Sequence, residues 1–571
     1  MITHEVLNQA PDRVDVNEFE SNAALVDAVK IWGTDAASAL LTEAGALVGS
    51  ADFQRDAELA GTHEPVLHTH DRHGNRIDEV EYHPAYHRVI GDAIARGAHT
   101  SAWAEPKPGA SVDRAAMFSL FAQVEPGHAC PISMTHAGAA ILKAADLPGR
   151  DEWWARAMSR DYVPSLHSPS ASRPASGDLA GRLGDEGAEW RPTALFGMAM
   201  TEKQGGSDVR ANTTRATPNA DGSFSITGHK WFCSAPMSDA FFVLAKTGAD
   251  SPEPKLSCFF VPRTLPDGTR NTFLIQRLKD KLGNRSNASS EVEFDGTIGW
   301  LVGEEGRGVR AILPMVSRTR LDCVIGTAAG MRQSVAEAAW HVRHRSAFGR
   351  TLIDQPAMTA VIADLQLEAE AATFTAMRLA RAHDEDAEGD AGELAFRRLA
   401  TAVAKYLVCK RGPAHAYEAL ECLGGNGYTE AFPLARRYRE QPVMAIWEGS
   451  GNVIALDVLR ALAREPESFH AFFTEVGIAR GDFQLFDEEL DAVQDLARRL
   501  RGMLQEGSGA AELRAREFTE RLGVLLEASL MLRYAPIPVA GAFVAARIGH
   551  PSALFGSLPT GIDLAAMVAR A

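Results

Sequence analysis

The chain has 571 residues, of which 46% are hydrophobic and 23% are charged, and its formal net charge is -16 at pH 7. This length exceeds what a single hydrophobic core organises, so we expect several packed domains with room for a large buried cofactor. The composition is that of a globular protein and not of a disordered or membrane protein. The negative charge disfavours general attraction to nucleic acid, so any DNA-binding surface has to be local.

No targeting or membrane segment is indicated. The first twenty residues are acidic and lack an apolar core with basic flanks, so we expect no secretory signal peptide and a cytoplasmic protein. The longest apolar stretch, residues 534–546, contains Pro536 and Pro538 and is shorter than the roughly 20 residues of a membrane helix. The six cysteines are scattered without a C-x-x-C pair, which is typical of reduced buried thiols rather than disulfides or zinc ligands.

Four segments follow one another along the chain. Residues 1–193 carry helical periodicity and predict an N-terminal helical domain, with a Pro-, Ser- and Gly-rich surface loop at 164–192. Residues 194–305 contain short apolar runs such as FSITGHKWF, separated by DG and PDG turns, and predict a β domain. Residues 306–463 predict a four-helix bundle, and residues 464–571 an extra helical segment. The expected fold class is therefore α+β.

The fingerprints GxGxxG and GxxxxGK[ST] are not found in the sequence, so a Rossmann or P-loop nucleotide site is not indicated. Residues 200–208, MTEKQGGSD, instead resemble the T-E-x-x-x-G-S-D flavin signature of the acyl-CoA dehydrogenase superfamily. By this resemblance Thr201, Gly206 and Ser207 bind FAD. A glycine-rich turn suits this role because it presents N–H groups and hydroxyls to the polar edge and phosphates of a flavin. In isolation such a turn is as often a solvated loop.

Residues 228–234, GHKWFCS, resemble the family's G-x-K-x-W-I-T strand, whose aromatic residue packs on the isoalloxazine. Phe232 takes the place of that tryptophan and Ser234 that of the threonine. A single strand of this pattern is more often ordinary core. Its position soon after the first motif favours a cofactor role.

Two further motifs resemble elements that meet the FAD of another subunit in the family. They are RSAFG with Gln355, and LGGNGY at residues 423–428. The guanidinium of Arg345 suits the pyrophosphate, and the other implied contacts are Phe348, Gln355, Gly424, Gly425 and Gly427. The resemblance thus implies a homotetramer with non-covalent FAD.

The reactive group is expected in residues 446–452, IWEGSGN, which resemble the family sequence whose glutamate is the catalytic base. Glu448 would remove the α-proton of an acyl-CoA while the β-hydride passes to flavin N5. Ile446 and Trp447 would desolvate this carboxylate and make it a stronger base. In isolation W-E-G is more often part of a loop. The further assignments are Ser450 and Asn452 to the cofactor, and Trp447 and Gly449 to the substrate pocket.

Some members of the family carry the base on the first long helix of the bundle. Alignment of that helix places Arg320 at the alternate position, with Asp322 two residues further on. Because an arginine cannot act as a base, Glu448 is the expected base. Arg320 and Asp322 are then expected at the acyl pocket, where Arg320 would crowd or neutralise it.

Long runs such as RLKDKLGNRSNASSEVEF resemble the alkylation-response branch of the superfamily over most of residues 60–462. This resemblance implies weak dehydrogenation of a short or branched acyl-CoA, with a DNA-protective flavoprotein of little turnover as the alternative. It does not choose between oxygen and an electron-transfer flavoprotein as the electron acceptor.

The charge of the C-terminal segment bears on DNA binding. Residues 464–571 hold eleven arginines, no lysine and fifteen acidic residues, so affinity for double-stranded DNA is expected to be weak. The candidate contacts are Arg498, Arg499, Arg501, Arg514, Arg516 and Arg521, with Arg436, Arg437 and Arg439 as a second candidate surface. A solvated helix face is the more common role of such arginines.

A histidine-rich stretch invites a metal site. It contains His63, His68, His70, His73, His83 and His87, and His83 and His87 have the spacing of one helical face. Because no nearby cysteine and no ordered pattern of supporting hydrogen-bonding residues accompany these histidines, we expect no metal.

Overall fold

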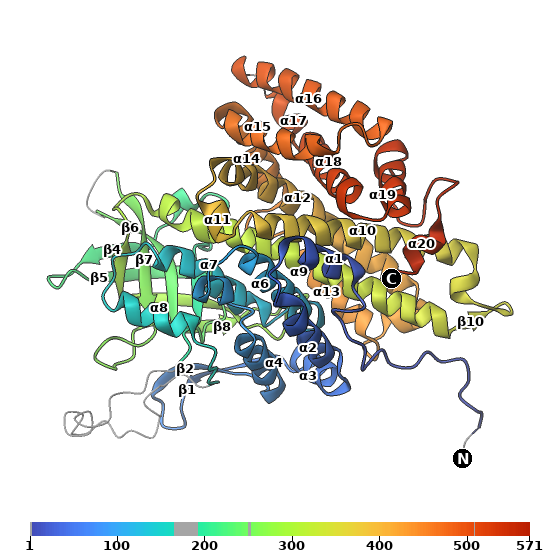
Figure 1. The fold of residues 1–571 in the computed structure, drawn as a ribbon. Helices are drawn as coiled ribbons and strands as arrows, with labels where there is room; N and C mark the ends of the chain where they lie inside the picture. Colours follow the sequence, from blue (N-terminus) through green and yellow to red (C-terminus); the bar gives the residue numbers. More distant parts are fainter. Residues whose placement is uncertain (1–2, 165–191, 249–252, 508) are drawn as a thin grey trace. The chain divides into compact units, whose positions relative to one another are not determined.

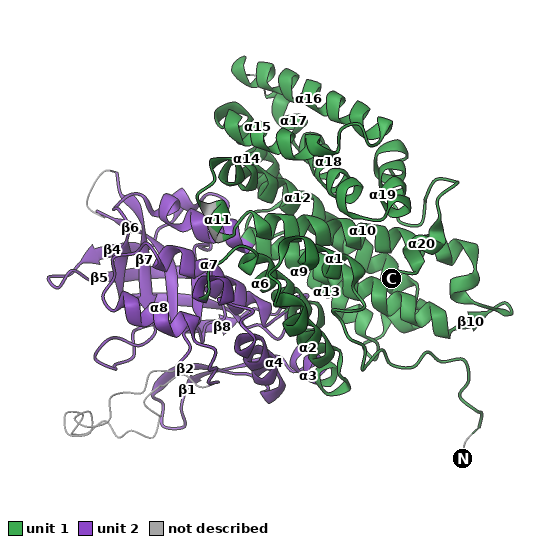
Figure 2. Ribbon diagram, in the orientation of Figure 1, with its two compact units in different colours: residues 1–55, 105–126, 320–571 green, residues 56–104, 127–319 purple. Residues whose placement is uncertain are grey.

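The computed structural model describes residues 3–164, 192–248, 253–507 and 509–571 (Figure 1). The surface loop expected at 164–192 therefore lies, except for its two end residues, outside the described residues. Two compact units are formed (Figure 2): unit 1 contains residues 1–55, 105–126 and 320–571, and unit 2 contains residues 56–104 and 127–319. Helices, a β domain, a helical bundle and further helices follow in that order, which confirms the expected α+β fold.

A seven-stranded mixed sheet forms the β domain of unit 2. Its strands are β3 (Phe196–Ala199), β4 (Arg215–Pro218), β5 (Phe224–Ser234), β6 (Ala240–Thr247), β7 (Lys255–Pro262), β8 (Leu274–Leu278) and β9 (Ser289–Val302). Strands β3 and β4 pair with β6 in parallel, and pairing of β6 with β7 closes the path β6-β4-β5-β9-β7. Strands β6 and β7 are buried on both faces, which explains their unbroken apolar sequences.

Helices and a hairpin complete unit 2. The hairpin pairs β1 (Val66–His70) with β2 (Arg76–Glu81), and Asp71 closes its turn by accepting from the backbone N–H groups of His73 and Asn75 at 2.8 and 2.9 Å. The helices are α4 (Pro84–Ala95), α5 (Ser101–Ala104), α7 (Ala129–Leu142) and α8 (Arg150–Met158), and α3 (Ala51–Thr62) extends into this unit. Helix α7 packs on β3.

A helical bundle forms the centre of unit 1. It consists of α9 (Gly308–His344), which belongs to this unit from residue 320, with α10 (Pro356–Arg381), α12 (Ala391–Glu421) and α13 (Pro433–Met444). The N-terminal helices α1 (Ala23–Trp32), α2 (Ala37–Gly49) and α6 (Ala110–Val124) belong to this unit, and α1 and α6 pack on α10. Helix α11 (Glu385–Glu388) lies between α10 and α12 in the chain.

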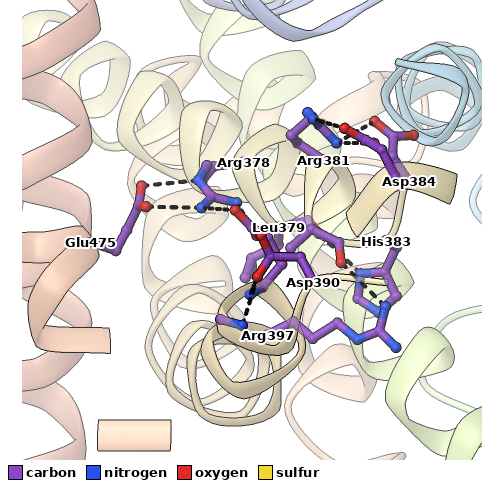
Figure 3. A network of polar contacts seen from close by, with 12 residues as sticks. Arg378, Leu379, Arg381, His383, Asp384, Asp390, Arg397 and Glu475 are labelled. Atoms are coloured by element: carbon purple, nitrogen blue, oxygen red, sulfur yellow. Dashed lines mark hydrogen bonds and ion pairs between the residues drawn. The ribbon is translucent and has the colours of Figure 1, made fainter. Parts of the chain in front are cut away.

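The C-terminal helices pack on this bundle. They are α14 (Gly451–Arg464), α15 (Pro466–Val476), α16 (Gln484–Gln505), α17 (Ala510–Leu513), α18 (Ala515–Tyr534), α19 (Ile537–Val544) and α20 (Leu564–Val568), with short turns η4 (Gly477–Ala479) and η5 (Ala545–Gly549). Figure 3 shows Arg378 of α10 directed at Glu475 of α15, where Nη2 lies 2.8 Å from Oε2. Arg547 of η5 likewise bonds Asp364 of α10 at 2.6 Å. Buried ion pairs therefore join the extra segment to the bundle.

None of the helices in the described ranges is long and apolar enough to cross a membrane. The six cysteines are buried free thiols.

Candidate active site

A buried ion pair holds the flavin-signature loop, which follows β3, against strand β5. Lys230 Nζ lies 2.8 Å from Glu202 Oε1 and donates to the Leu244 carbonyl at 2.7 Å. Glu202 also accepts from the backbone N–H groups of Thr213 and Thr214, at 2.6 and 3.1 Å. Burial alone would raise the pKa of Glu202, but the Lys230 charge and these hydrogen bonds hold it well below its usual range.

The predicted flavin contacts of this loop lie on its outer side. Thr201 is half-buried, and its carbonyl accepts from Trp231 N–H at 2.8 Å. A Cβ at Gly206 would lie 2.5 Å from Thr201 Oγ1, so only glycine allows this approach. Ser207 is exposed. The loop thus presents a hydroxyl and open backbone beside β5.

Strand β5 offers an uncovered aromatic face. Phe232 is 49% exposed, while Lys279 Nζ lies 3.1 Å from the ring centroid of Trp231 and 4.8 Å from that of Phe232. Ser234 Oγ lies 3.1 Å from Ser289 Oγ. Half of the Phe232 surface therefore remains available for stacking against a planar ligand.

In unit 1, two cations hold the loop that carries Glu448. Glu448 has φ 58° and Gly449 φ 114°, both in the left-handed region. Arg320 Nε donates to the Glu448 carbonyl at 2.9 Å, and Lys405 Nζ donates to the Gly449 carbonyl at 2.6 Å. Arg320 is itself held by Asp457 at 3.2 Å. Strained backbone of this kind persists where surrounding contacts fix it, and it is concentrated at functional sites.

The residues beside Glu448 differ in their burial. Trp447 packs against the buried cluster of Cys323, Cys409 and Met444. Ile446 is 65% exposed, so the expectation that it desolvates Glu448 is wrong for the single chain. Glu448 itself is half-buried, and Trp447 is the neighbour that supplies apolar packing.

The two residues expected at the acyl pocket have structural partners. Asp322 forms a buried ion pair with Arg114, whose Nη2 lies 3.0 Å from Asp322 Oδ2. Arg320 bonds Asp457 and the Glu448 backbone, so it orients the loop instead of standing as an isolated charge. Arg320 therefore supports the Glu448 loop, and its obstruction of the acyl pocket stays a prediction.

The second pair of motifs forms exposed turns of unit 1. Phe348, at φ 53°, is the tip between β10 (Ser346–Ala347) and β11 (Arg350–Thr351) and is 99% exposed. The preceding Arg345 is half-buried, and Gln355 Nε2 donates to the Ala347 carbonyl at 3.0 Å. The turn therefore holds its shape without covering its aromatic tip.

The glycine turn η3 (Gly424–Tyr428) is similarly open. A Cβ at Gly424 or Gly425 would meet nothing within 4 Å, whereas one at Gly427 would overlap the Leu420 carbonyl. Tyr428 is 87% exposed. The backbone of the first two glycines is thus accessible, while Gly427 packs on the end of α12.

At the start of α14, Ser450 and Asn452 are exposed, and Asn452 Oδ1 accepts from Arg516 Nη1 at 3.2 Å. Four residues of the candidate site were not predicted from the sequence: Glu202, Lys230, Lys405 and Asp457. A signal existed for the first two, since both stand inside matched motifs, and for Lys405, a lysine within the apolar helical run AVAKYLV.

Most candidate DNA-binding arginines are engaged in ion pairs. Arg498 pairs with Asp495, Arg514 with Glu517, and Arg521 with Glu489, while Arg516 bonds Tyr406 as well as Asn452. Arg437 is 4% exposed and donates to the Gln123 carbonyl. Arg437 is therefore wrong as a DNA contact, because a buried guanidinium cannot reach a phosphate, while Arg436 and Arg439 are half-buried and their role stays a prediction. Arg498, Arg499 and Arg501 remain exposed on α16.

We expect only weak, steeply salt-sensitive binding of duplex DNA, in the roughly 10⁻⁴ to 10⁻⁶ M range of non-specific binding. Reversal of Arg498, Arg499 and Arg501 to glutamate should abolish what binding exists. Mobility-shift titrations at two salt concentrations measure this. Tight binding that persists at high salt, or binding that survives the reversal, would place the surface elsewhere.

The histidines of the N-terminal region are engaged in other contacts. His68 Nε2 lies 2.9 Å from Glu81 Oε2, and the His63 ring stacks on His83, which caps α4. His87 Nδ1 lies 2.9 Å from the Tyr162 hydroxyl. Among the described residues, no group of three or more His, Cys, Asp or Glu side chains is arranged to hold a metal ion.

Comparisons with known proteins define the class. Three family models match in succession: the adaptive response protein AidB N-terminal domain over residues 8–164, the acyl-CoA dehydrogenase middle domain over 197–297, and the acyl-CoA dehydrogenase C-terminal domain over 306–463. The chain belongs to the acyl-CoA dehydrogenase family, in its AidB branch. It is 42% identical to AidB of Escherichia coli strain K12 over 95% of this chain and 94% of that protein.

More distant relatives agree with this assignment. Acyl-CoA dehydrogenase family member 11 of Caenorhabditis elegans is 28% identical over 80% of this chain and 72% of its own length. The apo form of Bd2924 matches with a TM-score of 0.80 and 25% identity, over 92% of this chain and 99% of that one. A crystal structure of Caenorhabditis elegans ACDH-11 in complex with C11-CoA gives a TM-score of 0.82 at 22% identity, over 100% and 93%, and shows the shared fold.

Proposed function

We propose that this chain is an FAD-dependent oxidoreductase that dehydrogenates an acyl-CoA, with Glu448 as the base. The observation that carries the proposal is the loop of Glu448 and Gly449. Its left-handed backbone is fixed by Arg320 and Lys405, and both cations donate to backbone carbonyls. These two cations therefore orient the loop through its backbone carbonyls. Such preorganisation is what positioned acid–base chemistry requires.

The proposed reaction removes one proton and one hydride from the acyl-CoA. Glu448 takes the proton from the α-carbon of the thioester, the β-carbon loses a hydride, and an α,β-unsaturated thioester remains. Bound FAD supplies the two-electron acceptor for the hydride. Gly449 keeps the loop close to its supports, since a Cβ there would lie 2.9 Å from Ile454 Cδ1 and 3.3 Å from an Arg320 nitrogen.

Residues present in the two units fit FAD by their chemistry. Unit 2 supplies the half-exposed ring of Phe232 and the hydroxyls of Thr201, Ser207 and Ser234. Unit 1 supplies Arg345, whose guanidinium suits a pyrophosphate, together with open glycine backbone in η3. Further support comes from Trp447, whose buried Nε1 has no hydrogen-bond partner within the described residues. The contacts assigned by resemblance to Phe348, Gln355, Ser450 and Asn452 belong to the same proposal.

Two further parts of the proposal concern substrate and assembly. The C11-CoA bound to the C. elegans relative supports an acyl-CoA as substrate class, and the AidB resemblance favours a short or branched acyl group. The resemblance of RSAFG and LGGNGY to motifs that meet the FAD of another subunit supports a homotetramer in which these turns, with Phe348 99% and Tyr428 87% exposed, face another subunit.

The test is a turnover assay with short, branched and medium-chain acyl-CoAs and an artificial electron acceptor. We expect at least one acyl-CoA to yield its α,β-unsaturated thioester, identified by mass spectrometry, and flavin extracted from the protein to be FAD. A flavin-free folded protein, or FAD-loaded protein that forms no unsaturated product with any member of the panel, would contradict the proposal.

A further inference from the structure

An N-terminal strap, defined here as residues 8–11, lies against the turn that carries Arg345. Asn8 bonds both backbone polar groups of Ser346: its Nδ2 donates to the carbonyl at 2.8 Å, and Ser346 N–H donates to its Oδ1 at 2.8 Å. The Asn8 carbonyl then accepts from Arg345 Nη1 at 2.6 Å, and Gln9 Oε1 accepts from the same nitrogen at 3.2 Å. One residue, Asn8, therefore fixes both the backbone of the turn and its guanidinium.

The strap is ordered by polar contacts rather than by burial. Asn8 and Gln9 are exposed, and Asn8 has φ 55°, a conformation that asparagine tolerates better than most residues. Trp340 Nε1 donates to the Pro11 carbonyl at 2.8 Å, which anchors the other end on α9. Since exposed chain ends are rarely ordered without specific ties, these bonds determine where the strap lies.

The contact between the strap and Arg345 leaves one edge of the guanidinium suited to binding an anion. Both strap bonds use Nη1, so the Nε–Nη2 edge, whose two parallel N–H groups match two phosphate oxygens, lies outside the contact. Both acceptors are neutral, so the strap orients the guanidinium without cancelling its charge. A carboxylate at the same place would instead compete with a phosphate.

We propose that Asn8 and Gln9 are positioning residues that hold Arg345 for the pyrophosphate of FAD. This inference rests on the proposed function, and it gives the N-terminal region a part in cofactor binding. The strap lies within the residues matched by the AidB N-terminal domain and outside those matched by the two acyl-CoA dehydrogenase domains.

The experiment measures FAD affinity of the full-length apoprotein by flavin fluorescence titration. Asn8→Ala is expected to raise the Kd for FAD about tenfold, as for the net loss of one to two hydrogen bonds. Asn8→Asp should raise it further, because a carboxylate oxygen would then face the Ser346 carbonyl in place of the donating amide nitrogen. Thr3→Ala, which removes a hydroxyl bonded to the neighbouring His4, is the matched control and should leave the Kd unchanged.

A double-mutant cycle separates positioning from general support of the fold. Asn8→Ala should add little to the loss caused by Arg345→Ala, because Asn8 acts through that guanidinium. Full additivity, or an unchanged Kd in Asn8→Ala while Arg345→Ala weakens FAD, would overturn the inference and leave the proposed function standing. A parent protein that binds no FAD would overturn both. Equal apoprotein melting temperatures for parent and Asn8→Ala are expected, and they exclude misfolding as the cause.

Discussion

Replacing Glu448 by glutamine is expected to slow acyl-CoA-driven flavin reduction at least about 100-fold, while the fold and the bound FAD remain. The amide has the shape of the carboxylate but cannot take the α-proton. The loop should persist, since Arg320 and Lys405 hold backbone carbonyls that the substitution does not alter. Stopped-flow absorbance under anaerobic conditions measures the rate per FAD-loaded molecule.

Arg320→Ala is the companion variant for Glu448→Gln. Because Arg320 donates to the Glu448 carbonyl and is paired with Asp457, its loss should lower the rate of flavin reduction, although by less than loss of the base. If Glu448→Gln reduces its flavin as fast as the parent, the carboxylate is not the base. A faster Arg320→Ala variant would instead favour the obstructing role expected from the sequence.

Lys230→Met should destabilise unit 2 by about 3 to 5 kcal/mol, the usual cost of leaving one partner of a buried ion pair uncompensated. Both Lys230 and Glu202 are fully buried, and Glu202 also holds the N–H groups of Thr213 and Thr214. The flavin-signature loop should therefore loosen and FAD should be lost. Denaturant unfolding and flavin retention measure the two effects.

The double variant Glu202→Gln/Lys230→Met is the control for Lys230→Met. Because it removes both charges, it should recover much of the lost stability. The lowered pKa of Glu202 means that ionisation of this carboxyl favours the folded state at neutral pH and that this contribution is lost as the pH falls below the ordinary pKa of a glutamate, whereas burial lowers the pKa of Lys230. A single variant as stable as the parent would show that the pair contributes little.

The fold could be predicted because the residue patterns within each segment agree with the order of the domains along the chain. Alternating apolar runs with DG turns marked the sheet, and the return of helical periodicity after residue 306 marked the bundle. The two strands β1 and β2 of the N-terminal region were not predicted, because their alternation is short and their residues are largely exposed. Resemblance to family motifs named Glu448 and Phe232 as candidates without any knowledge of their neighbours.

The residues that contact the candidate site from distant parts of the chain could not be predicted from the spacing of the motifs. Arg320 meets the Glu448 backbone 128 positions along the chain, and Asn8 meets Ser346 across 338 positions. Contacts between residues so far apart in the chain depend on how the helices and the strap pack. The sequence around a charged residue on a helix does not indicate which distant residue will be its partner. Among the C-terminal arginines, Arg498 pairs with Asp495 three positions away in the same helix, whereas Glu489, the partner of Arg521, lies 32 positions away and could be identified only once α16 and α18 were placed.

We propose that this chain oxidises acyl thioesters with its own flavin. Anaerobic titration of the purified protein with a panel of acyl-CoAs is the direct test of this activity. We predict that the oxidised flavin absorbance bleaches with a short or branched acyl-CoA and that the same ligand fails to bleach Glu448→Gln on the same timescale. Retention of full flavin absorbance by the FAD-loaded parent with every acyl-CoA would contradict the proposed acyl-CoA dehydrogenase activity.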